Sequence, residues 1–128
     1  MSTKTILKPA KSPPAVGPYN HGVRVGDLLF SAGQIPIDPA NPTGPLPEGI
    51  QAQAERVLLN VKAILEDQGL TFTNVVKTTV FMTNLADFTA MNEVYGRHFT
   101  GDFPSRSTVQ VAALPRGAQV EIEFIAHY

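Results

Sequence analysis

The chain has 128 residues, of which 43% are hydrophobic and 16% charged, and its formal net charge is -1. This length predicts one globular domain over residues 1–128, and the near-neutral charge gives no broad basic surface for nucleic acid or anionic lipid. Because the chain has no cysteine, disulfides, thiolate nucleophiles and zinc sites built on sulfur are excluded.

Motifs for metal binding and targeting are also lacking in the sequence. The three histidines, His21, His98 and His127, do not have the spacing of metal ligands. Residues 1–11 alternate lysines with apolar residues and lack the continuous apolar stretch of a signal peptide. No segment is apolar over the length that a bilayer requires, so we expect a cytoplasmic protein without a membrane partner.

The first third of the chain predicts a hairpin followed by an irregular loop. Residues 22–25 and 28–34 are short apolar runs on either side of Gly26-Asp27, a dipeptide typical of a hairpin turn. A further strand is considered near residues 3–7. Four prolines within residues 38–48 exclude a helix or a central strand there.

Two amphipathic helices are predicted, with a strand between them. The first covers residues 50–65, where apolar residues recur at spacings of three and four, and Gly69 favours its end. Residues 75–82 have the Val and Thr content of a strand. A second helix is expected to begin near Asn84, with a capping box to Asp87. Its apolar face would carry Phe88, Met91, Tyr95 and Phe99.

Two final strands, residues 106–113 and 119–126, are joined by residues 114–117. The resulting order, β-β-α-β-α-β-β, predicts an α+β fold. Two helices can cover only one face of such a sheet. The other face contains Val, Thr and Gln, so we expect a partly polar subunit interface to cover it.

Four side chains are candidates for chemistry. Arg106 follows a proline turn at the start of a strand, where its rigid guanidinium could bind a carboxylate or simply pair on the surface. Glu121 and Glu123 share one strand face and could equally be solvated. Tyr19 follows a Gly-Pro turn that could aim its hydroxyl into a site or pack its ring against the domain edge.

Gly33 and Asn92 are weaker candidates. A glycine in a strand lets a ligand oxygen approach its amide closely, or it marks a β-bulge. Asn92 lies one turn after Phe88, and we expect its amide to satisfy backbone groups internally, with a place at the border of the site as the alternative.

Six motifs, in order, resemble the reactive intermediate deaminase family, also called RidA, YjgF or L-PSP. They are GPY at residues 17–19, SAGQIP at 31–36, NVVKTTV at 74–80, FPSR at 103–106, VQVAALP at 109–115 and VEIE at 120–123. The resemblance extends over residues 14–126, which is almost the whole chain.

The resemblance implies a chorismate-mutase-like fold, a mixed sheet with two helices on one face, and a homotrimer around a central barrel. It places active sites in clefts between subunits. Glu121 matches the family glutamate that holds a water and passes protons. The ligand contacts that the resemblance implies would come from Arg106 and Tyr19, from the amides of Gly33 and Thr108, and from Asn92.

The implied activity is that of a 2-iminobutanoate/2-iminopropanoate deaminase. It hydrolyses 2-aminoacrylate and related imines to 2-keto acids and ammonia. Imines already hydrolyse in water, so positioning and one proton relay suffice, and no metal or other cofactor is expected. Two positions depart from the family pattern, because Ala32 replaces a frequent serine and Thr108 a frequent cysteine. A mechanism that needs a thiol is therefore excluded.

Two other functions stay open. The family is also described as an endoribonuclease or translation inhibitor, but the near-neutral charge argues against a nucleic-acid partner. Alternatively, the chain is a keto-acid-binding or chaperone-like module. Such a module would keep Arg106 but need not keep Glu121.

Overall fold

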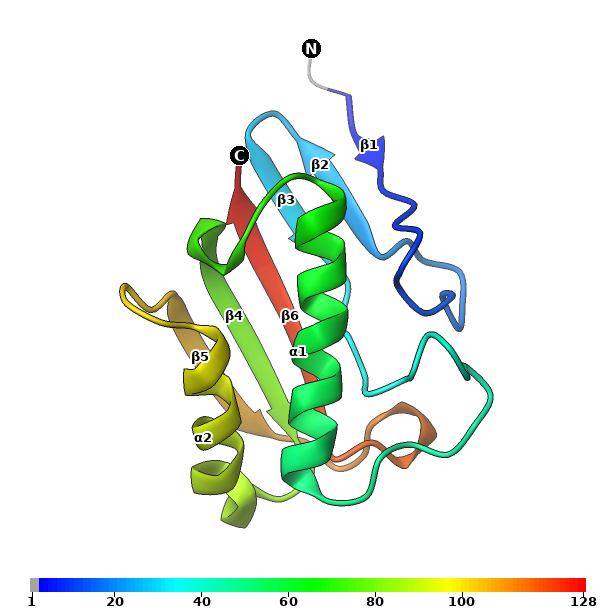
Figure 1. Ribbon diagram of the computed structural model, residues 1–128, viewed down its shortest axis with the longest axis vertical. Coiled ribbons are helices and arrows are strands. Elements are labelled where there is room, and N and C mark those ends of the chain that lie inside the picture. The colour runs from blue at the N-terminus through cyan, green and yellow to red at the C-terminus, as the bar shows by residue number, and fades with distance from the viewer. Residues whose placement is uncertain (1–2) are drawn as a thin grey trace.

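The computed structural model describes residues 3–128 and confirms the α+β fold (Figure 1). Two helices, α1 (Ile50–Asp67) and α2 (Phe88–His98), lie on the same face of one six-stranded sheet, as predicted. The strand order is β1-β2-β3-β6-β4-β5, and only β4 and β5 are parallel neighbours. The strands are β1 (Thr5–Ile6), β2 (Gly22–Val25), β3 (Leu28–Ser31), β4 (Val75–Met82), β5 (Ser105–Gln110) and β6 (Val120–His127).

Helix α1 packs on the sheet through the predicted apolar stripe and ends before Gly69, whose φ of 70° favours glycine. One polar residue beside this stripe, Asn60, is also fully buried. Its Nδ2 donates hydrogen bonds of 3.2 and 2.8 Å to the carbonyls of Ile35 and Ile37. These bonds hold the segment after β3 against the helix. The stripe consists of Ala54, Val57, Leu58, Val61, Ile64 and Leu65.

Helix α2 differs from its prediction at its first turn. Asn84 caps a short 3₁₀ turn, Leu85–Asp87, instead of the α-helix, and the expected capping box is wrong. Phe88 was expected in the core, but its side chain is 38% exposed at the edge of the domain. Val94 completes the buried face in its place, together with Met91, Tyr95 and Phe99.

Strand β3 ends earlier than predicted because of a bulge. Its pairing with β6 stops after Phe30 and resumes at Gln34. The three residues between, 31–33, lie opposite only two residues of β6. The Ser31 hydroxyl accepts a hydrogen bond of 2.8 Å from the Phe124 N–H and so fills the gap in the ladder. The bulge brings its last residue, a glycine, against β6.

The loop after β5 is tied to the proline-rich loop. Strand β5 ends at Gln110, three residues before its predicted end, and no helix or strand forms in residues 38–48, as expected. Arg116 adopts a left-handed conformation with φ of 58°. Its guanidinium donates hydrogen bonds of 2.8 and 2.6 Å to the carbonyls of Pro42 and Gly44. The two loops therefore form one connected end of the domain.

The face of the sheet without helices is partly apolar and partly polar. Lys77, Thr79 and Glu123 lie on it, together with several large apolar side chains. These apolar side chains are 39% to 42% exposed, and they belong to Val25, Leu28, Phe30 and Val109. The mixed composition agrees with the partly polar face that the sequence predicts, and its cover by a subunit interface stays a prediction.

Candidate functional site

Arg106 lies at the start of β5, where two aromatic rings hold its guanidinium. The Arg106 Cζ is 4.7 Å from the centre of the Tyr95 ring and 5.4 Å from that of Phe88. Neither ion pair in the described chain involves this arginine, since they join Lys62 to Glu66 and His98 to Glu55. Aromatic faces stabilise a cation without neutralising it, so the guanidinium stays ready to bind an anion.

Tyr95 is itself fixed by the sheet. Its hydroxyl shares a hydrogen bond of 2.7 Å with the buried Thr78 Oγ1, and its ring stacks on Phe99 at 4.4 Å. Burial raises the pKa of Tyr95, while the Thr78 hydrogen bond and the positive charge of Arg106 oppose this rise. The ring is therefore a rigid, neutral platform for the arginine.

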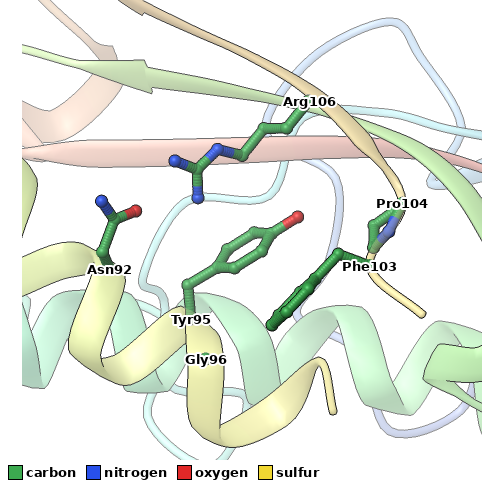
Figure 2. A pocket seen from close by; sticks show the side chains of 6 residues that line it. All are labelled: Asn92, Tyr95, Gly96, Phe103, Pro104 and Arg106. Carbon is green, nitrogen blue, oxygen red and sulfur yellow. The ribbon is translucent and has the colours of Figure 1, made fainter. Parts of the chain in front are cut away.

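A cavity of about 310 Å³ opens beside this platform (Figure 2). Asn92 lines it from helix α2, and its amide points toward the Arg106 guanidinium. The Asn92 Oδ1 is buried and accepts no hydrogen bond from residues 3–128, so the expectation that it satisfies backbone groups is wrong. The alternative, a place at the border of the site, agrees with the structure. The other lining residues are Tyr95, Gly96, Phe103 and Pro104.

Thr108 follows Arg106 on the same face of β5, because side chains alternate along a strand. Its Oγ1 is buried and has no hydrogen-bond partner in the described part of the chain. The structure thus places Arg106, Thr108 and Asn92 in one region, which we call the arginine half-site.

Glu121 belongs to a second group of the expected residues. It lines a cavity of about 240 Å³ together with Tyr19 and Gly33. Burial raises the pKa of Glu121, and repulsion from the Glu123 carboxylate raises it further. We call this region the glutamate half-site; its remaining lining residues are Val16, Ala32 and Pro115.

Gly33 lies directly beside the Glu121 side chain. A Cβ built on this glycine would lie 2.7 Å from the Glu121 Cδ and closer still to Oε2. The β-bulge, one of the two readings of Gly33 that the sequence left open, is therefore confirmed. The other reading, a close approach of a ligand oxygen to the Gly33 amide, stays a prediction. The carboxylate occupies the space that any other side chain at position 33 would need.

Tyr19 closes the glutamate half-site from the N-terminal loop. A tight turn, in which the Tyr19 N–H donates to the Gly17 carbonyl at 2.9 Å, points the ring toward the bulge. The Tyr19 hydroxyl accepts a hydrogen bond of 3.3 Å from the Val16 N–H, and the side chain remains 43% exposed. The hydroxyl proton is therefore free to be donated.

The two half-sites lie on opposite faces of the sheet. Arg106 pairs with Thr78 of β4, which is buried beneath the helices, whereas Glu121 pairs with Phe81, one of the β4 residues that point the other way. Directly paired residues share a face, and neighbours along a strand alternate. Within one chain, the sheet therefore separates the arginine from the glutamate.

The sequence did not reveal the aromatic platform. Tyr95 was predicted as a core residue and Phe88 as its neighbour in the core, and neither was linked to Arg106. A signal was present, because Asn92 and Tyr95 lie three residues apart on a helix that precedes the arginine strand. Only the packing of α2 against β5 showed that this face reaches the guanidinium.

Comparisons with known proteins identify relatives of this chain. The sequence model of the family described as endoribonuclease L-PSP matches residues 9–128. The chain belongs to this family, the RidA/YjgF reactive intermediate deaminases. Protein DfrA of Myxococcus xanthus is 54% identical over 91% of this chain and 89% of its own length. The 2-iminobutanoate/2-iminopropanoate deaminase of Capra hircus is 45% identical, over 96% and 89%.

A solved relative has the same fold. The crystal structure of Escherichia coli TdcF with bound serine superimposes with a TM-score of 0.90 at 44% identity, covering 97% of this chain and 98% of that one. Within residues 3–128, no helix is long and apolar enough to cross a membrane, and no three acidic, histidine or cysteine side chains gather as metal ligands.

The raised pKa of Glu121 can be measured directly. In a pH titration followed by ¹³C NMR of the side-chain carboxyl groups, Glu121 should titrate above the ordinary value for glutamate. Glu123→Gln should lower this pKa, because it removes the repelling carboxylate, but burial should keep it above the ordinary value. A Glu121 pKa at or below the ordinary range in the parent protein would contradict this description.

Proposed function

We propose that this RidA/YjgF family member hydrolyses 2-imino acids to 2-keto acids and ammonia. The observation that carries the proposal is an arginine without an acidic partner, held by aromatic rings beside a cavity. A 2-imino acid offers such an arginine its carboxylate. The names of the deaminases from Capra hircus and Escherichia coli, and the serine bound to TdcF, support the same class of ligand.

We further propose that the active site forms between two copies of the chain. The arginine half-site and the glutamate half-site face away from each other across the sheet, so one copy would supply Arg106 and the next Glu121. A closed ring of three copies, as in the family, gives every arginine half-site one glutamate half-site. It would also cover the exposed apolar side chains of the sheet face without helices.

In this site, Arg106 would bind the carboxylate through its forked donors, assisted by the Thr108 and Gly33 amides. Glu121 would accept a proton from a water that attacks the imine carbon and would return this proton to the nitrogen, which gives the carbinolamine. Glu121 would then move the hydroxyl proton of the carbinolamine to its amine, and the C–N bond would break, leaving a 2-keto acid and ammonia. A carboxyl group with a raised pKa suits this work, because its carboxylate is a stronger proton acceptor than an ordinary one and can still return the proton. Tyr19 would help to close the site.

The other two functions receive less support. An endoribonuclease gains most of its affinity from phosphate contacts, and a chain with a net charge of -1 offers few. A binding module without turnover would use Arg106 but gain nothing from a buried carboxyl group with a raised pKa. Substitution of Glu121 therefore separates an enzyme from a binder.

Arg106→Ala should abolish the thermal protection that a 2-keto acid gives to the parent protein, while the fold stays intact. Arg106→Lys should restore this protection poorly, because a point charge does not reproduce the two-pronged contact. Differential scanning calorimetry with 2-oxobutanoate measures both effects. Equal protection of the parent and Arg106→Lys would show that the anchor lies elsewhere.

Glu121→Gln should still bind a 2-keto acid, but its rate of imine hydrolysis should fall by roughly a hundredfold or more, the usual scale for a lost general acid and base. Glu123→Gln is the matched control, because it lies on the same strand face two residues further along. Stopped-flow assays of 2-aminoacrylate generated in situ report the rates. If both variants hydrolyse the imine at the parent rate, the proton relay is not Glu121.

Mixing the variants tests the shared site. Arg106→Ala and Glu121→Gln, each nearly inactive alone, should recover roughly a quarter of the parent activity when unfolded and refolded together at equal amounts, because each mixed trimer has one intact site. Light scattering should give the mass of three chains. A monomer mass, or mixtures no more active than the separate variants, would argue against a site between subunits.

A further inference from the structure

Asn92 presents an unused hydrogen-bond acceptor inside the arginine half-site. Its Oδ1 is shielded from solvent and accepts no hydrogen bond within residues 3–128, although it lines the same cavity as Arg106. A buried carbonyl oxygen without a donor costs free energy, because it has lost its hydrogen bonds to water and gained none in return. Such an orphan beside an anion site indicates that a ligand supplies the missing donor.

The surroundings of Asn92 restrict what that donor is. Of the other residues that line the cavity, the side chains of Gly96, Phe103 and Pro104 carry no hydrogen-bond donor (Figure 2). The Arg106 guanidinium does carry donors, but no hydrogen bond joins it to Asn92 Oδ1. The Tyr95 hydroxyl is already engaged with Thr78 at 2.7 Å. The Asn92 amide and the Arg106 guanidinium point toward one another, so one small molecule can touch both.

The chemistry of the proposed substrate fits this pair of groups. In a 2-imino acid, the nitrogen is bonded to the carbon next to the carboxylate. The imine nitrogen and the carboxylate are therefore close enough for one bound molecule to place each beside a different side chain. The carboxylate needs cationic donors, which Arg106 has. The imine nitrogen, neutral or protonated, carries N–H donors and needs an acceptor, which Asn92 Oδ1 provides.

We propose that Asn92 recognises the nitrogen of the substrate and thereby distinguishes a 2-imino acid from the 2-keto acid that it becomes. This inference rests on the proposed function, and it adds a selectivity element to it. When hydrolysis replaces C=N–H by C=O, the donor is lost and two carbonyl oxygens face each other. The product is then held by its carboxylate alone, which favours its release over that of unreacted substrate.

Two stable acids with the same carbon skeleton serve as probes. 2-Aminobutanoate carries N–H donors next to its carboxylate, and 2-oxobutanoate carries none. Isothermal titration calorimetry of the assembled protein measures the Kd of each. Asn92→Leu keeps the approximate size of the side chain but removes the acceptor, and Asn92→Ala removes it without adding bulk to the cavity. Thr89→Leu, an exposed position on the same helix that does not line the cavity, is the control.

In both Asn92 variants, the affinity for 2-aminobutanoate should fall about tenfold or more, whereas that for 2-oxobutanoate should change less than threefold. Thr89→Leu should leave both affinities as in the parent. Equal losses for both acids would overturn the inference, because they would mean that Asn92 only positions Arg106. Unchanged affinities would overturn it as well.

The proposed function fails in a different way in this experiment. If the parent protein binds neither acid, or if Arg106→Ala binds both as well as the parent, the carboxylate site itself is wrong, and the role of Asn92 is lost with it. If the parent binds both acids through Arg106 but the Asn92 variants lose affinity equally for both acids, the result supports the carboxylate site. It then rejects only the inference about Asn92.

Discussion

The sheet that holds this domain together also separates the two side chains on which the proposed chemistry depends. Arg106 and Glu121 lie on strands that both pair with β4, but the alternation of side chains sends them to opposite faces. No movement of either side chain can cross a sheet of packed backbone. Within one chain the two groups therefore cannot reach a common ligand, and this separation is the reason for proposing a site between two copies.

Each half-site is prepared in advance by its own packing. The guanidinium rests on Tyr95, which is fixed by a buried threonine, and this arrangement limits the entropy that anion binding would cost. The carboxyl group of Glu121 fills the space that Gly33 leaves free, where burial raises its pKa. In the proposed shared site, each half-site would supply only one of the two groups, so reactivity would be confined to the assembled protein.

The bulge after β3 connects the fold to the site. It interrupts the ladder for three residues, and the Ser31 hydroxyl replaces one of the missing backbone partners. Asn60 then holds the next segment against α1 through two carbonyls. The position of Gly33 beside Glu121 thus depends on the pairing with β6, on the Ser31 hydroxyl and on the hydrogen bonds from Asn60 of α1. These contacts fix an irregular segment that has no continuous strand pairing of its own.

The sequence alone determined the elements and most of the candidate residues. Periodicity found α1 and its buried stripe, β4 matched its predicted bounds, and the motifs around Arg106 and Glu121 pointed to the right family, because these signals are local. The exposure of Phe88, the unpartnered Asn92 and the separation of the two half-sites came only from the tertiary structure. They depend on how α2 packs on β5 and on which face each strand presents, and strand register and helix packing are set by contacts between residues far apart in the chain.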